Sequence, residues 1–162
     1  MYYKNSDIKD GRDDTVMDVF KDLYQQLIID HNQSPQNFRR LENPSHSAEG
    51  HNPLCGDEIT ISIIEKNGII NDITFLGSGC AISKASASIM TSVLKGMKVE
   101  DAKILFENFH ILATTGKSSG DLGKLSALAG VHKYPARVKC ATLAWHTFQG
   151  ALNNSSEIIK TE

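Results

Sequence analysis

The chain has 162 residues, which is enough for one domain with a substantial hydrophobic core and short for two. Its formal net charge of −2, with 22% charged residues, includes no excess of Lys and Arg, so we expect no nucleic-acid partner. No apolar run reaches the roughly 18 residues that a membrane-spanning helix needs, so we expect no membrane partner either.

Three cysteines, an odd number, argue against a framework of paired disulfides. Residues 1–14 are polar and acidic and lack the apolar core of a signal peptide, so we expect a flexible leader and a cytoplasmic protein. In a reducing compartment, thiols serve as metal ligands, as nucleophiles or as ordinary core residues. The position of each cysteine in the fold has to decide among these roles.

An amphipathic helix is predicted to follow the leader. Thr15 and Asp18 resemble an N-terminal capping signal, and Pro35 follows the polar end of the helix. Its apolar residues recur at three- and four-residue spacing and make one buried stripe: Val16, Val19, Phe20, Leu23, Tyr24, Leu27 and Ile28. Residues 35–53 are polar and are predicted to be mostly loop, with at most a short edge strand near Ala48.

A period of two residues then predicts a β-hairpin. Apolar residues alternate with polar ones in both strands, and the apolar ones are Ile59, Ile61, Ile63, Ile73 and Phe75. The Asn67-Gly68 pair between the strands favours a tight turn.

The burial pattern selects the register of this hairpin. A two-residue turn at Asn67-Gly68 would place apolar Ile61 opposite polar Thr74. A three-residue loop ending at Gly68 pairs Ile61 with Ile73 instead. We therefore expect the longer loop, with Gly68 as the left-handed residue of a bulge.

Three further helices are predicted in the second half of the chain. Their ranges are 80–95, capped by Gly96, then 99–113, and finally 135–152. The Gly-rich segment 114–131 is predicted to be a loop with a short helical turn, and the tail, residues 153–162, is expected to be loose. These elements predict a single α+β domain over residues 15–152, with about five helices packed against a small antiparallel sheet of about three strands.

Local geometry gathers three side chains of the kinds that bind metal ions. The expected register, extended away from the turn, pairs Asp57 with Gly77 and Cys55 with Gly79, so both side chains point to one face of the sheet. Cys80 comes next and opens a helix, where the helix dipole and the free amides favour a thiolate.

Cys140 is a fourth candidate that local geometry does not bring to this place. It lies on the inward face of the last helix, and Arg137, three residues earlier, would raise the positive potential at the thiol. Three thiolates and one carboxylate in a tetrahedron suit zinc. Spacing alone leaves ordinary core packing open for the cysteines and an ordinary salt bridge open for Arg137, and His51 is an alternative ligand.

The three cysteines lie in the segments Asn52-Pro-Leu-Cys-Gly-Asp57, Gly77-Ser-Gly-Cys80 and Ala136-Arg-Val-Lys-Cys-Ala-Thr-Leu-Ala-Trp145. These segments resemble the cysteine motifs of the IscU/NifU scaffold family of iron–sulfur cluster assembly. They resemble more closely its SufU branch, the zinc-dependent sulfurtransferases of Gram-positive bacteria. The resemblance covers about residues 19–152.

Two features favour the SufU branch. Residues 114–131 resemble the insertion that distinguishes SufU from IscU, and Lys139 occupies the position where IscU-type scaffolds carry a histidine ligand. The resemblance therefore implies an IscU/NifU-like fold and a Zn²⁺ ion held by Cys55, Asp57, Cys80 and Cys140.

The resemblance also implies a partner and a mechanism within the SUF system. A pyridoxal-phosphate cysteine desulfurase of the SufS type docks with the help of Arg137, and one of its histidines takes a zinc position. Cys55 is thereby freed to accept persulfide sulfur and to carry it to downstream iron–sulfur assembly components. The alternatives are a scaffold on which iron and a transient [2Fe–2S] cluster occupy the same residues, and a fold whose zinc is only structural.

Overall fold

The computed structural model describes residues 21, 24–118 and 120–161. The predicted leader and the capping signal at Thr15 lie outside these residues. A first helix is described over residues 24–33. The labelled elements follow in the order β1 His46–Asn52, β2 Asp57–Lys66, β3 Ile69–Ser78, α2 Ala81–Leu94, α3 Val99–Thr115, η1 Gly123–Lys133, α4 Pro135–Leu152 and β4 Ile159–Lys160.

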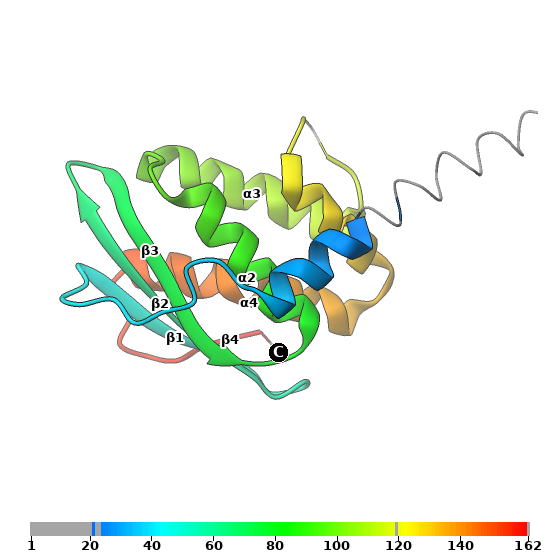
Figure 1. Ribbon diagram of the computed structural model, residues 1–162, viewed down its shortest axis with the longest axis horizontal. Coiled ribbons are helices and arrows are strands. Elements are labelled where there is room, and N and C mark those ends of the chain that lie inside the picture. Colours follow the sequence, from blue (N-terminus) through cyan, green and yellow to red (C-terminus); the bar gives the residue numbers. More distant parts are fainter. Residues whose placement is uncertain (1–20, 22–23, 119, 162) are drawn as a thin grey trace, which may run out of the picture.

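The strands form one sheet with the order β3-β2-β1-β4, and helices cover one of its faces (Figure 1). Helix α4 lies across β1 and β2, helix α2 packs against β3, and α3 lies outside them against α4 and η1. This arrangement confirms the predicted α+β class. None of the described helices is both long and apolar enough to cross a membrane.

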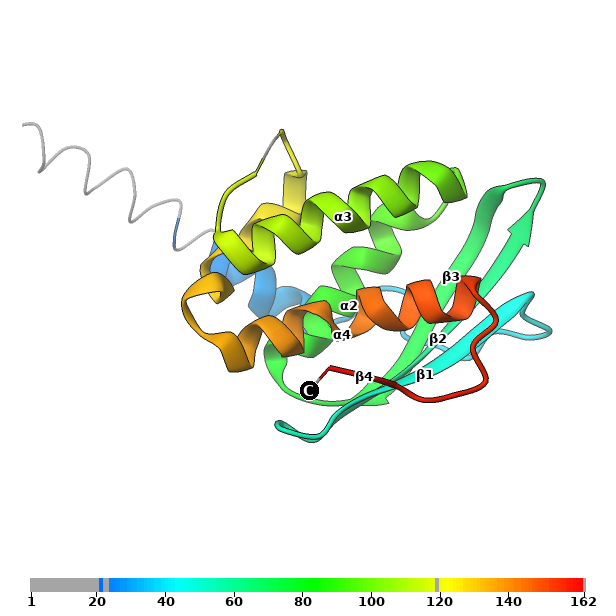
Figure 2. The same ribbon diagram turned by 180° about the vertical axis from the view of Figure 1, so that it is seen from behind.

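The sheet differs from the prediction in two of its strands. Strand β1 lies inside the sheet, between β2 and β4, and is not a short edge strand. Strand β4 pairs with β1 in parallel, through Gly50 with Ile159 and His51 with Lys160, so the sheet is mixed. The tail that we expected to be loose therefore contains one ordered pairing, which Figure 2 shows beneath α4.

The predicted register of the hairpin is wrong. The turn is the two-residue one, with Asn67 and Gly68 both at positive φ (54° and 77°), as a type I′ turn requires. A register shift at Ile64/Glu65 leaves Asn71 as an extra residue of β3. Beyond this bulge, Ile61 pairs with Phe75 and not with Ile73, so apolar residues still face each other.

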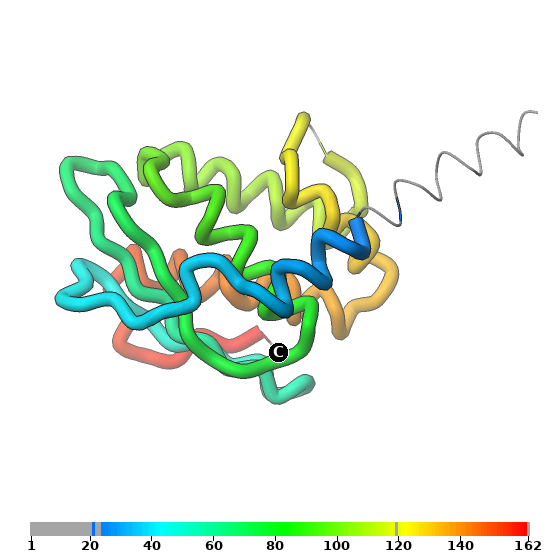
Figure 3. Tube along the Cα trace, viewed as in Figure 1, coloured from blue at the N-terminus to red at the C-terminus, as the bar shows by residue number. Residues whose placement is uncertain are grey.

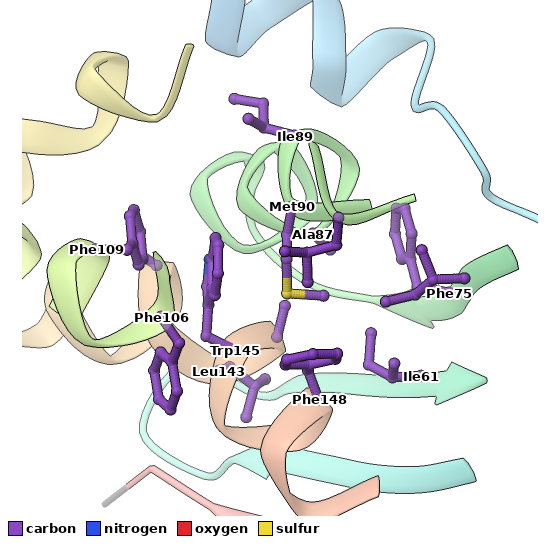
Figure 4. Packing of buried hydrophobic residues seen from close by; sticks show 14 of the residues in the cluster. Ile61, Phe75, Ala87, Ile89, Met90, Phe106, Phe109, Leu143, Trp145 and Phe148 are labelled. Carbon is purple, nitrogen blue, oxygen red and sulfur yellow. The ribbon is translucent and has the colours of Figure 1, made fainter. Parts of the chain in front are cut away.

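The core joins the inner face of the sheet to the helices. Side chains from β2, β3, α2, α3 and α4 point toward one another, as Figure 4 shows for Ile61, Phe75, Met90, Phe109, Trp145 and Phe148. Trp145 stacks on Phe109 with ring centroids 4.7 Å apart and an interplanar angle of 19°. This core fixes α4 over the sheet and thereby sets the position of Cys140.

The first helix and the segment after it are anchored to the same body. His31 is buried, and its Nδ1 lies 2.7 Å from Ser88 Oγ in α2. The following segment runs along β3, where the Phe75 amide donates to Asn37 O at 3.0 Å (Figure 3). The chain then turns back into β1.

Candidate metal centre

Cys55 lies in the turn between β1 and β2. The backbone amides of Cys55 and Gly56 both donate to Asn52 O, at 3.3 and 2.8 Å, and Gly56 has a φ of 75°. We expected an extended segment here, with Cys55 opposite Gly79 and Asp57 opposite Gly77. Instead Gly77 pairs with Ile59 of β2, and Asp57 pairs on its other side with Asn52 of β1. The tight turn leaves the Cys55 side chain exposed at the end of the sheet.

Asp57 is buried and its carboxylate joins three parts of the chain. Oδ1 accepts a hydrogen bond from the Cys80 backbone amide at 2.9 Å, and Oδ2 accepts one from Asn52 Nδ2 at 3.1 Å. A Cβ at Gly79 would lie 2.6 Å from Oδ1, so only glycine lets the carboxylate approach this closely. These contacts tie the β1–β2 turn to the N-terminus of α2.

Cys140 is fully buried in α4, and its Sγ lies 3.4 Å from Cys55 Sγ. Ligand atoms of Cys55, Asp57 and Cys140 all lie within 4.8 Å of one another. Burial, followed by hydrogen bonds with Cys55, Asp57 and Cys80, raises the pKa of Cys140 far above its ordinary value. The buried thiol therefore stays protonated at neutral pH unless a metal ion binds it.

Cys80 stands at the edge of this group. It is the N-cap of α2, and its Sγ accepts a hydrogen bond from the Ser83 amide at 3.4 Å. Its Sγ is not among the atoms that lie within 4.8 Å of one another, although it is close enough to influence the pKa of Cys140. The expected helix N-terminus beneath Cys80 is thus present.

Arg137 lies one turn before Cys140 on α4 and is exposed. Interaction with the Cys140 side chain, followed by the charges of Cys80, Cys140 and Cys55, raises the pKa of Arg137, so the guanidinium lies near the thiols. Within the described part of the chain, no carboxylate lies within salt-bridge distance of Arg137.

Asn52 is a residue of the site that the sequence reasoning missed. It is fully buried, and Nδ2 donates both to Asp57 Oδ2 and toward Cys140 Sγ, the latter at 3.5 Å. Its Oδ1 has no hydrogen-bond partner among the described residues. A polar amide directly before a ligand loop was the available signal, because such residues often orient metal ligands.

The donor set of this group fits a metal ion. Two thiols and a carboxylate converge at one end of the sheet, with a third thiol beside them, and no described lysine hydrogen-bonds into the group. Sulfur with one oxygen in a set of four is chemistry that zinc accepts, and iron also binds thiolates. The group is therefore a candidate metal centre.

Comparison with known proteins gives the family. Residues 23–141 match the protein family described as NifU-like N terminal domain. The chain belongs to this family.

Similar proteins come from iron–sulfur cluster assembly. The chain is 42% identical over 130 residues to the zinc-dependent sulfurtransferase SufU of Bacillus subtilis, which covers 78% of this chain and 87% of that protein. It is 37% identical over 139 residues to the iron–sulfur cluster assembly scaffold protein IscU of Thermotoga maritima. That match covers 85% of this chain and 98% of the Thermotoga protein. The chain is thus a member of the IscU/SufU group of iron–sulfur cluster assembly proteins.

A solved structure supports the same assignment. The putative iron–sulfur cluster assembly scaffold protein for the SUF system from Fervidobacterium islandicum superposes with a TM-score of 0.74 at 34% identity. The match covers 78% of this chain and 93% of that one. The predicted IscU/NifU-like fold and SufU-type resemblance are confirmed.

Proposed function

We propose that this protein binds zinc through Cys55, Asp57, Cys80 and Cys140 and accepts persulfide sulfur on Cys55 from a cysteine desulfurase. The name of the Bacillus relative, a zinc-dependent sulfurtransferase, supports the ion and the reaction class. The observation that carries the proposal is the gradient of exposure among three clustered thiols. Cys55 is exposed, Cys80 is half-buried and Cys140 is buried.

The exposed thiol is the one that a partner protein can reach. Cys55 sits next to Leu54, which is 63% exposed, at the tip of the β1–β2 turn. Cys140 is a fully buried residue of α4, so a persulfide carried on another protein's loop has no path to it. Reactive cysteines need both accessibility and thiolate character. When bound, a zinc ion supplies the positive charge that keeps the site thiols in the thiolate form.

The transfer is an exchange between a thiol and a persulfide. The Cys55 thiolate attacks the terminal sulfur of the partner's persulfide, and a new S–S bond forms on Cys55. The S–S bond in the partner breaks, and the partner's cysteine leaves as a thiolate. The Cys55 sulfur is oxidised and the partner's sulfur is reduced, so the step needs no outside oxidant.

Arg137 is placed to serve the docking of that partner. Its guanidinium is exposed beside the thiols and also borders an apolar hollow of about 540 Å³ with Ile82 and Tyr134. A bidentate cation next to apolar surface is a frequent anchor in protein interfaces. The charge-matched control is Lys133, which is exposed in η1 and does not line this hollow.

Replacement of Cys55 by alanine tests the proposal if metal content and desulfurase stimulation are scored separately. We expect a folded protein that no longer raises desulfurase turnover and carries no persulfide by intact-mass spectrometry. When this protein is present at limiting concentration, Arg137→Ala is expected to weaken the stimulation of the desulfurase, whereas Lys133→Ala is not. Unchanged stimulation by the Cys55→Ala protein would remove Cys55 from the mechanism. Loss of the fold in that variant would assign the zinc a structural role.

A second candidate function is a scaffold for a nascent [2Fe–2S] cluster on the same residues. The names of the Thermotoga and Fervidobacterium proteins favour it, since both are called scaffold proteins. A scaffold isolated without oxygen after incubation with iron, cysteine and a desulfurase would be brown and would transfer its cluster to an apo-ferredoxin. A sulfur carrier would stay colourless and keep its zinc.

A further inference from the structure

A second hollow, of about 520 Å³, is lined by none of the four candidate metal ligands. One flank of α4 forms its floor, His110 of α3 borders it, and β4 with the residue after it forms the opposite wall. Figure 2 shows these three elements side by side, with the C-terminal segment running beneath α4. The hollow falls within the size range of small-molecule sites in proteins, about 300–1,000 Å³.

The lining of this hollow is basic. Two lysines, Lys139 and Lys160, and two histidines, His110 and His146, are among the lining residues. None of the lining residues that the structure describes is Asp or Glu, although the whole chain has a net charge of −2. A lining with two lysines and no described carboxylate disfavours a metal cation, so the charge pattern favours an anion.

The two imidazoles lie close together. The ring centroids of His110 and His146 are 5.7 Å apart, and the Phe106 ring packs edge-on against His146 at 5.2 Å. Burial, and then the nearby His110, lower the pKa of His146. An anion between the rings and the lysines would raise the pKa of His146 and so oppose both of these effects.

Thr161 is one of the lining residues, and its hydroxyl is unsatisfied. Thr161 is 7% exposed, and its Oγ1 has no hydrogen-bond partner among the described residues. Its backbone amide donates to His51 O at 3.2 Å, which fixes the residue against β1. This hydroxyl is closed off from solvent, so Thr161 contributes its anchored backbone to the wall and not a donor to a ligand.

The walls are held by packing and by strand pairing. Ile159 pairs with Gly50 of β1 and packs directly over Gly150 of α4, where a Cβ would lie 2.7 Å from Ile159 Cδ1. Lys160 and Thr161 follow from this anchored residue. The basic groups are therefore presented on a preformed wall.

We propose that this hollow binds a small molecule with two or more anionic groups, either phosphates or carboxylates. In this site Lys139 and Lys160 pair with the anionic oxygens. The proposal does not depend on the proposed sulfur transfer.

The test uses the zinc-loaded full chain and the imidazole NMR signals of its histidines at a fixed pH. Pyrophosphate is titrated in one arm and tricarballylate in the other, and zinc content is measured before and after. We expect saturable shifts of the His110 and His146 signals. The signal of His31, which does not line the hollow, is expected not to shift. The arm with the tighter binding tells a phosphate ligand from a carboxylate ligand.

Two double variants with equal change in net charge decide whether the hollow is responsible. Lys139→Gln with Lys160→Gln is expected to weaken binding roughly tenfold, because the change removes both ion pairs with the ligand. Lys98→Gln with Lys103→Gln removes two exposed lysines outside the hollow and is expected to leave the affinity unchanged. The proposal is wrong if neither anion gives a saturable shift, or if both double variants weaken binding equally.

Discussion

The geometry of the candidate metal centre depends on single atoms. Asp57 reaches the Cys80 amide because Gly79 has no side chain, and Asn52 holds the other carboxylate oxygen. In both contacts Asp57 is the candidate ligand, and the donors are a backbone amide and the side chain of Asn52, which is not a candidate ligand. Such supporting contacts orient metal ligands, and their loss typically weakens metal affinity without removing a ligand.

Gly79→Ala tests this dependence. The added Cβ would lie 2.6 Å from Asp57 Oδ1 and 3.2 Å from Asp57 Cγ, so the carboxylate has to move. We expect zinc affinity to fall roughly tenfold to a hundredfold in competition with a chromophoric chelator. The control is Gly130→Ala, because a Cβ there meets nothing within 4 Å. Equal affinities of the two variants would show that the position of the carboxylate does not matter.

At the scale of elements, the sequence predicted most of what builds the site. The spacing of apolar residues placed α4 at Pro135–Leu152 and both strands of the hairpin. It failed at the hairpin register because two local features compensate: a tight turn shifts the pairing by one residue, and a bulge at Asn71 shifts it back into phase. Alternation of burial constrains only whether pairs are apolar, and several registers satisfy it.

The tight turn makes its own prediction about stability. Gly68 has a φ of 77° and open space around its Cα, so Gly68→Ala changes only the backbone energy. We expect a loss of about 1 kcal/mol in urea unfolding, since a residue with a Cβ disfavours this conformation. Gly130→Ala, at a position without positive φ, is expected to cost less. Equal costs would argue against the two-residue turn.

At the scale of the whole molecule, packing brings together residues that are distant in sequence. Cys140 meets Cys55 across 85 positions because Trp145 and Phe148 of the same helix are buried in the common core. Spacing could not predict this approach, and the motif resemblance implied it. The pairing of Ile159 was also out of reach, because two residues are too few for a periodic signal.

The same long-range packing predicts sensitivity to acid. Burial lowers the pKa of His31, as does Lys124, and burial and His110 lower that of His146. Both histidines therefore bind fewer protons in the folded than in the unfolded chain at mildly acidic pH. Stability is then lost as the pH falls below about 6.5, the ordinary histidine pKa. Urea unfolding at pH 7.5 and 5.5 should show this loss, and His31→Gln should make it smaller. An equal loss in wild type and variant would contradict this role of His31.

The central claim is that the side chains of Cys55, Asp57, Cys80 and Cys140 meet at one zinc ion. Zinc K-edge X-ray absorption of the purified protein measures the ligand set directly, with Cys80→Ser as the decisive variant because its thiol stands at the edge of the group. We expect three sulfur ligands at about 2.3 Å and one oxygen ligand in the wild type, and two sulfurs in the variant. Two sulfurs in both proteins would contradict the claim.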